Sequence, residues 1–83
     1  MKITLRFFSS LREQLGLSIQ AYETVSINVD QLRTELMLLN PNYAQALGSG
    51  KAIRVAVNQE VCEDNALLSE GCEVAFFPPV TGG

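Results

Sequence analysis

Short segments that alternate between apolar and polar side chains limit the fold of this chain more than any other feature. In residues 2–8 every second side chain is apolar and belongs to one face, namely Ile3, Leu5 and Phe7. A period of two is typical of a half-buried β-strand. Residues 53–57 repeat this pattern, and residues 72–77 predict a last strand with Val74 and Phe76 facing inward.

Two further segments complete a sheet of five predicted strands. Residues 19–29 are rich in β-branched side chains, which favour strands. Residues 59–63 fit a short fourth strand, followed by a loop over 64–71. We expect the first two strands, joined by a short helix, to form an extended hairpin.

One segment in the middle of the chain has clear helical spacing. Leu32, Leu36 and Leu39 lie at i, i+4 and i+7, which places them on one side of a helix. Asp30 is a suitable N-cap residue. Pro41 ends this helix, because proline has no N–H with which to continue it.

Two shorter helical segments accompany this main helix. Ser10 and Glu13 have the spacing of a capping box, and Gly16 is suited to end the helix that they begin. Residues 41–47 can form one more helical turn. The elements predict an α+β domain over residues 1–77, in which a mixed five-stranded sheet packs on one main helix.

Composition excludes several classes of function. The chain has 83 residues, enough for one domain without a separate catalytic domain. It has no histidine, which removes Ser-His-Asp and Cys-His nucleophile pairs and the usual zinc sites, so we expect no catalytic site of its own and no metal. A net charge of −3 with scattered basic residues argues against binding of nucleic acid. Neither a polybasic stretch nor a long apolar run supports membrane attachment.

The cysteines and the N-terminus suggest a reducing compartment. Cys62 and Cys72 are too few for a disulfide scaffold. The first residues lack the apolar region of a signal peptide, so we expect reduced thiols and a cytoplasmic protein. Both cysteines are better explained as small hydrophobic residues than as sulfur donors.

The last ten residues, 74–83, carry no charged side chain. Pro78 and Pro79 favour a stiff polyproline II spacer that keeps the following residues off the sheet. Residues 78–83 can extend roughly 20 Å, and Gly82 and Gly83 have no Cβ, so they can enter a narrow channel. We therefore expect residues 78–83 to be an extended functional tail that delivers its α-carboxylate into the active site of another protein. A frayed chain end is the alternative.

A carboxylate is a poor acyl donor and needs activation, for example as an acyl-adenylate. This chain offers no nucleotide site of its own. The segment 48–51 looks like part of a phosphate loop, but Gln45 and Ala52 stand where that motif requires glycine and serine or threonine. We expect no bound cofactor, and ATP to be used by an activating partner.

Several motifs point to a known family. They are Phe7-Phe8, Leu11-Arg12-Glu13, Val57-Asn58-Gln59 and, most specifically, residues 73–83 with the sequence Glu-Val-Ala-Phe-Phe-Pro-Pro-Val-Thr-Gly-Gly. Through them the chain resembles, over essentially its whole length, the small subunit of molybdopterin synthase, a ubiquitin-like sulfur carrier. The resemblance implies a β-grasp fold in which the first and last strands are parallel neighbours.

The resemblance also implies a mechanism and a set of partners. A ubiquitin-activating-like adenylyltransferase adenylates the carboxylate of Gly83, and sulfur from a sulfurtransferase persulfide converts it to a thiocarboxylate. The tail then inserts into the large subunit of molybdopterin synthase, within a heterotetramer, and gives its sulfur to cyclic pyranopterin monophosphate. Gly82 belongs with Gly83 to the reactive end of the chain. The residues expected to contact partners along the tail are Pro78, Pro79, Val80 and Thr81.

A docking surface beside the tail is a separate expectation. Phe8 and Phe77 fall on the polar side of their strands, where aromatic residues are out of pattern. With the first and last strands side by side, both rings would lie at the root of the tail, with Val61 on the adjoining short strand. We expect these three residues to form an exposed apolar docking patch, with Arg12 as a charge at its rim. The alternative is that one ring folds over the sheet edge and caps the core.

Three other interpretations stay open. A sulfur carrier of another pathway, such as thiazole synthesis, also ends in Gly-Gly. A ubiquitin-like protein modifier begins with the same adenylate. A plain interaction module with a frayed tail is the third. An iron–sulfur β-grasp protein is excluded, because a cluster needs about four cysteine ligands.

Overall fold

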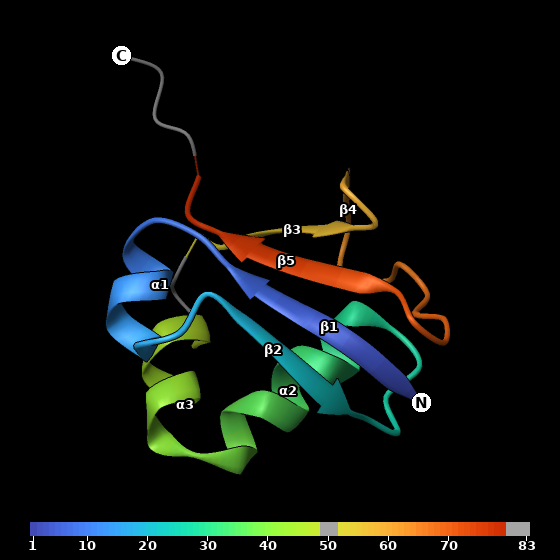
Figure 1. The fold of residues 1–83 in the computed structure, drawn as a ribbon, viewed down its shortest axis with the longest axis horizontal. Coiled ribbons are helices and arrows are strands. Elements are labelled where there is room, and N and C mark those ends of the chain that lie inside the picture. Colours follow the sequence, from blue (N-terminus) through green and yellow to red (C-terminus); the bar gives the residue numbers. More distant parts are fainter. Residues whose placement is uncertain (49–51, 80–83) are drawn as a thin grey trace.

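The computed structural model of the chain describes residues 1–48 and 52–79. The elements of this part are, in order, β1 (Lys2–Phe7), α1 (Ser10–Leu15), β2 (Ile19–Glu23), α2 (Val29–Leu39), α3 (Pro41–Leu47), β3 (Arg54–Val57), β4 (Glu60–Cys62) and β5 (Glu73–Phe77). The three helices gather on one side of the sheet (Figure 1). The predicted α+β fold is confirmed, with α2 as the main helix and α1 and α3 beside it.

The five strands form one mixed sheet in the order β2-β1-β5-β3-β4. Strand β1 pairs antiparallel with β2 and parallel with β5, with Leu5 opposite Val74 and Phe7 opposite Phe76. Strand β3 is antiparallel to both β5 and β4. The first and last strands are therefore parallel neighbours, as expected, and β5 occupies the middle of the sheet.

The core lies between the sheet and the helices. The predicted inward-facing residues of β1 and β5 are at most 2% exposed. The rings of Phe7 and Phe76 stack with their centroids 5.9 Å apart, and Tyr43 of α3 lies at the same distance from Phe7. Burial of these large rings supplies much of the hydrophobic stabilisation that a small domain needs.

Helix α2 begins earlier than the sequence predicted. Its N-cap is Asn28, whose side-chain oxygen accepts a hydrogen bond from the N–H of Gln31 at 2.8 Å. The prediction of Asp30 as the cap was wrong, and Asp30 lies instead in the first turn. Leu36 is fully buried as expected, but Leu39 is 56% exposed, because the helix ends there and the chain turns into α3.

Helix α1 also differs at its start. Ser9 is the N-cap, with φ 54° and no side-chain hydrogen bond to the helix, and Ser10 is already helical. The predicted capping box is therefore not formed, because the helix begins one residue earlier than that motif requires. The predicted stop is confirmed, since Gly16 has φ 75° and donates its N–H to the carbonyl of Arg12 at 2.9 Å.

Strand β2 ends at Glu23, six residues before the predicted end at 29, because side chains of the following loop bind to α2. The Glu35 carboxylate accepts hydrogen bonds from the hydroxyls of Tyr22, Thr24 and Ser26 at 2.5, 2.6 and 2.7 Å. Burial alone would raise the pKa of Glu35, but these three hydrogen bonds and the nearby N-terminal ammonium hold it below its ordinary value. We call Glu35, Tyr22, Thr24 and Ser26 the Glu35 network.

Candidate functional site

The face of the sheet opposite the helices is open, and the strand register orders its side chains in rows. One row crosses all five strands and consists of Ile19, Arg6, Ala75, Ala56 and Val61. A second row, nearer the end of β5, consists of Phe8, Phe77 and Arg54. We refer to these two rows together as the open face.

The structure brings two of the three predicted patch residues together. Phe8 directly follows β1, and its N–H donates a hydrogen bond to the carbonyl of Phe76 at 3.2 Å, so Phe8 and Phe77 occupy the same end of neighbouring strands. Phe8 is 38% exposed, and Phe77 is half-buried. The ring of Phe8 lies over the guanidinium of Arg6, with 5.3 Å between the guanidinium carbon and the ring centroid.

Val61 lies farther from the two phenylalanines than we expected. Strand β4 adjoins β3 and not β5, so two residues of the row, Ala56 and Ala75, separate Val61 from β1. Val61 is 58% exposed, whereas both alanines are only 6% exposed. Val61 therefore does not form one continuous exposed patch with Phe8 and Phe77, because the alanines between them are buried.

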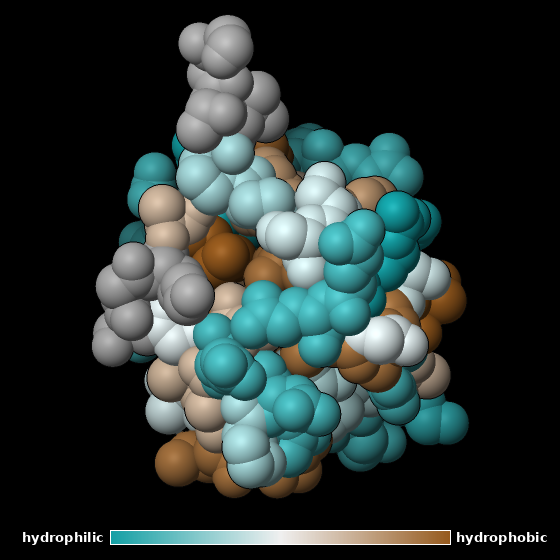
Figure 2. Space-filling model, turned by 90° about the vertical axis from the view of Figure 1, so that its left-hand side faces the viewer, coloured by the Kyte–Doolittle hydropathy of each residue, from teal (hydrophilic) through white to brown (hydrophobic). Residues whose placement is uncertain are grey.

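The other predicted site residues are divided between the described and the undescribed parts of the chain. Arg12 is exposed on α1. Pro78 is half-buried and Pro79 exposed, both directly after β5. The remaining predicted residues, Val80, Thr81, Gly82 and Gly83, lie outside the described residues. Seen from the side of α1, hydrophobic surface bordered by hydrophilic side chains is exposed just below the last described residues (Figure 2).

Sequence reasoning missed two exposed residues of the open face. Ile19 is 59% exposed and lies opposite Arg6, at the β2 end of the longer row. Arg54 is exposed and lies opposite Phe77 on β3. Alternation alone assigns each of them to a face of its own strand, but only the register between strands places Ile19 beside Arg6 and Arg54 beside Phe77.

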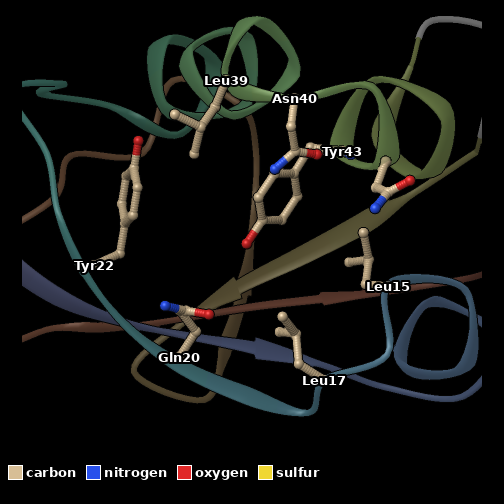
Figure 3. A pocket seen from close by; sticks show the side chains of 8 residues that line it. Leu15, Leu17, Gln20, Tyr22, Leu39, Asn40 and Tyr43 are labelled. Carbon is tan, nitrogen blue, oxygen red and sulfur yellow. Dashed lines mark hydrogen bonds between the residues drawn. The ribbon is translucent and has the colours of Figure 1, made fainter.

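A cavity of about 320 Å³ opens elsewhere, between β2 and the junction of α2 and α3. Its lining consists of Leu15, Leu17, Gln20, Tyr22, Leu39, Asn40, Asn42 and Tyr43, with the hydroxyl of Tyr43 and the amide groups of Gln20 and Asn40 directed toward it (Figure 3). No residue of the predicted tail or docking patch contributes to it. Its lining has no charged side chain and no nucleophile beside a base, so it offers no reaction chemistry of its own.

The cysteine thiols occupy unreactive settings. Cys72 is 2% exposed. Cys62 is half-buried, with its sulfur 3.8 Å from the carbonyl of Val55, and burial is the main cause that raises the pKa of its thiol. A raised pKa lowers the thiolate fraction that sulfur transfer requires. Within residues 1–48 and 52–79, no group of three His, Cys, Asp or Glu residues is placed to hold a metal ion, and no helix is long and apolar enough to cross a membrane.

Comparison with known proteins extends over nearly the whole chain. A model of the ThiS family matches residues 5–83. The molybdopterin synthase sulfur carrier subunit of Escherichia coli strain K12 is 38% identical over 81 residues, which cover 98% of this chain and 99% of the relative. The protein of the same name from Haemophilus influenzae is 36% identical over 77 residues, covering 93% of this chain and 94% of the relative.

Solved structures share the same fold. Small archaeal modifier protein 1 from H. volcanii aligns with a TM-score of 0.78 and 22% identity, over 95% of this chain and 98% of that one. A chain in the complex of subunits 1 and 2 of molybdopterin-converting factor from Helicobacter pylori aligns with a TM-score of 0.69 and 23% identity, over 100% of both chains. These likenesses confirm the ubiquitin-like β-grasp fold. Taken with the family match and the curated relatives, they show that this chain belongs to the ThiS family, among proteins named molybdopterin synthase sulfur carrier subunits.

Proposed function

We propose that this chain is the sulfur carrier subunit of a molybdopterin synthase and donates sulfur from the carboxyl group of Gly83. The observation that carries the proposal is the end-to-end relation to curated sulfur carrier subunits, which covers 98% of this chain and 99% of the relative from E. coli. The family match runs to residue 83, so the tail belongs to the related region. The absence of histidine and the unreactive cysteines are consistent with a carrier whose chemistry is performed by partner enzymes.

In the proposed sequence of steps, a partner adenylyltransferase joins a carboxylate oxygen of Gly83 to the α-phosphate of ATP and releases pyrophosphate. The terminal sulfur of a sulfurtransferase persulfide attacks the acyl carbon, and AMP leaves. A thiol then takes the sulfurtransferase sulfur into a disulfide, which leaves the thiocarboxylate on Gly83. This soft, ionised sulfur is a better nucleophile than the oxygen it replaces, and it attacks an electrophilic carbon of cyclic pyranopterin monophosphate and displaces an oxygen leaving group. Water then hydrolyses the acyl–sulfur bond, which leaves the sulfur on the pterin and restores the carboxylate of Gly83.

The arrangement of the chain suits this role if residues 1–77 form the folded domain and residues 78–83 the tail. Strand β5 ends at Phe77, and two prolines follow it, which cannot donate ladder hydrogen bonds. Phe8 and Phe77 lie on the open face beside this exit, and the exposed Val61 lies on the same face two strands away from β5. We propose that the large subunit of the synthase and the adenylyltransferase dock there, with Arg12 at the rim. In H. pylori, a complex of subunits 1 and 2 of molybdopterin-converting factor has been solved, and one of its chains has the fold of this protein.

The direct test is the intact mass of the chain after co-expression with its adenylyltransferase and sulfurtransferase. We expect the mass to rise by the difference between one sulfur and one oxygen atom. The matched control lacks Gly82 and Gly83 and should show no such increase, although its circular dichroism spectrum and thermal midpoint should equal those of the full chain. An unchanged mass in the full chain with all partners active would contradict the proposal.

The two competing functions predict different products in the same cells. A protein modifier would appear as ladders of larger proteins that carry this chain on lysine. A carrier for thiazole synthesis would leave molybdenum enzymes active when the gene is deleted and would create a requirement for thiamine instead. We expect the reverse, with loss of molybdenum enzyme activity and growth without added thiamine.

A further inference from the structure

Arg6 is a charged side chain in the middle of the open face. It lies between Ile19 of β2 and Ala75 of β5 in the row that crosses the sheet. Its Nη1 is 3.5 Å from Oε2 of Glu73, and its guanidinium lies over the ring of Phe8. These two contacts hold the guanidinium among the residues that we expect to dock on a partner.

The hydrogen bonding of this guanidinium is incomplete. Its Nε–H is buried and finds no acceptor within the described residues. Its contact with Glu73 is a single long one, and the two side chains keep 38% and 27% of their surface exposed. A guanidinium has five donors in a planar fork that matches a carboxylate. Most of this capacity is unused, and a buried donor without an acceptor is unfavourable.

A second arginine gives the same end of the open face a positive charge. Arg54 is exposed opposite Phe77, and it forms no ion pair within the part of the chain that the structure describes. Arg6 and Arg54 are the charges nearest Phe8 and Phe77, whereas Glu73 lies beyond Arg6, and Glu63, directly after β4, lies on the far side of Arg54 in the register. Fixed charge of one sign around an apolar centre favours a partner of the opposite sign.

We propose that the protein surface that docks on the open face is acidic around an apolar centre, and that its carboxylates pair with Arg6 and Arg54. This inference rests on the proposed function, which makes this face the docking site, and adds the chemistry by which the partner is selected. A partner carboxylate would accept hydrogen bonds from the guanidinium fork of Arg6 that Glu73 leaves free. Arg6 and Arg54 are then specificity-determining residues, because a neutral or basic surface of the same shape would leave their charges desolvated and unpaired.

The test measures binding of the full chain to the large synthase subunit of its own organism. The variants are Arg54→Glu, Arg6→Gln and Arg6→Glu. The matched control is Lys2→Glu, which makes the same reversal of charge on the same face of β1 but at the opposite end of the strand. We expect each glutamate variant to raise Kd on the order of tenfold or more, Arg6→Gln to raise it less, and Lys2→Glu to leave it within about twofold.

Ionic strength provides a second measurement. Kd of the unchanged protein should rise as salt is raised, because exposed charges are screened, and this slope should be smaller in Arg54→Glu. Arg6→Glu places two carboxylates side by side, so its thermal midpoint must be measured. Among residues 1–48 and 52–79 Arg54 has no ion pair to lose, which makes Arg54→Glu informative even if Arg6→Glu unfolds.

The outcomes separate this inference from the proposed function. If the unchanged protein binds the large subunit but Arg54→Glu and Arg6→Gln bind equally well, with the same salt dependence, the acidic partner surface is refuted and the carrier function stands. If a glutamate variant binds more tightly, the partner surface is basic and the inference is also refuted. If the unchanged protein does not bind the large subunit at all, the proposed function and this inference both fail.

Discussion

Glu35 and Arg6 are both half-buried charged side chains, yet their surroundings differ. The Glu35 carboxylate on α2 accepts three hydroxyl hydrogen bonds of 2.5 to 2.7 Å. The Arg6 guanidinium on β1 has one ion pair at 3.5 Å and a buried Nε–H without an acceptor among the described residues. The first charge is satisfied within the chain, whereas the second is only partly satisfied.

This difference separates two regions for which we expect different roles. The Glu35 network joins the loop after β2 to α2, and so it fixes how the sheet and the main helix fit together. The open face around Arg6 lies beside the end of β5, where the chain continues into Pro78. The Arg6 guanidinium there uses few of its hydrogen-bond donors to stabilise the fold. We therefore expect changes in the core and the Glu35 network to alter stability, and changes on the open face to alter partner binding.

The largest expected effects come from two adjacent phenylalanines on opposite faces of β5, which test whether the core and the open face have different roles. Phe76 is 1% exposed and stacks on Phe7. We expect Phe76→Ala to lower the free energy of unfolding by about 3–5 kcal/mol, as is usual for a buried aromatic ring. Urea denaturation followed by circular dichroism measures this loss.

The matched change on the open face is Phe77→Asp. We expect it to lower the free energy of unfolding by only about 1 kcal/mol, while binding to the large subunit falls on the order of a hundredfold, as for an interface anchor. Titration calorimetry of the folded variant measures the binding. Equal binding by Phe77→Asp and the unchanged protein would show that the open face does not dock the partner.

The Glu35 network offers a smaller effect with a characteristic dependence on pH. Glu35→Gln keeps one acceptor oxygen but removes the charge that three hydroxyls share, and we expect a loss of about 1–3 kcal/mol at pH 7. Because the folded-state pKa of Glu35 is lowered, its contribution is fully present above the unfolded pKa, near 4.3, and disappears as the pH falls through the folded pKa.

Urea midpoints of both proteins measured from pH 7 to pH 3 test this. The gap between the unchanged protein and Glu35→Gln should narrow as the pH falls below the unfolded pKa. A gap that stays constant over this range would mean that the charge of Glu35 does not stabilise the fold. Assembly with the large subunit should be the same for both proteins at pH 7.

The smallest expected effect is that of Tyr22→Phe, which removes one donor from the same carboxylate. Burial and the hydrogen bond to Glu35 hold the pKa of Tyr22 well above its ordinary value, so its hydroxyl remains a donor across the physiological range. We expect a loss of about 0.5–1.5 kcal/mol. In the double variant with Glu35→Gln, the two losses should be less than additive, because the residues share one network.

The sequence predicted the parts of this fold that follow from local spacing. Alternation identified β1 and the inward-facing Val74 and Phe76, and the leucine spacing identified α2. The starts of α1 and α2 were misplaced locally, by one and two residues, whereas the end of β2 was misplaced because side chains bond to a residue distant in sequence. The sequence predicted Thr24 and Ser26 to be strand residues, but their hydroxyls bind Glu35 of α2, and β2 ends before them. Such contacts leave no local pattern.

The candidate site was predictable to a different extent. Phe8 and Phe77 were identified because each is an aromatic residue on the polar side of its strand. Both do lie at the same end of neighbouring strands. Ile19 and Arg54 gave no such signal, because their position on the open face depends on the register between strands. The docking role of Phe8, Val61 and Phe77, and the roles of Arg12 and the tail, remain predictions for the binding and mass measurements.

The place of β5 in the sheet has a consequence for how this protein is made. The strand latest in sequence inserts between β1 and β3, in the middle of the sheet. During synthesis the β1–β2 hairpin and the helices can form as they leave the ribosome, but the sheet cannot close until Phe77 has emerged. Pairing of strands so distant in sequence is slow compared with local contacts. The strand that completes the fold is also the one that leads into residues 78–83, so a partner that needs both the closed sheet and these residues, as proposed above, would engage only a domain that has finished folding.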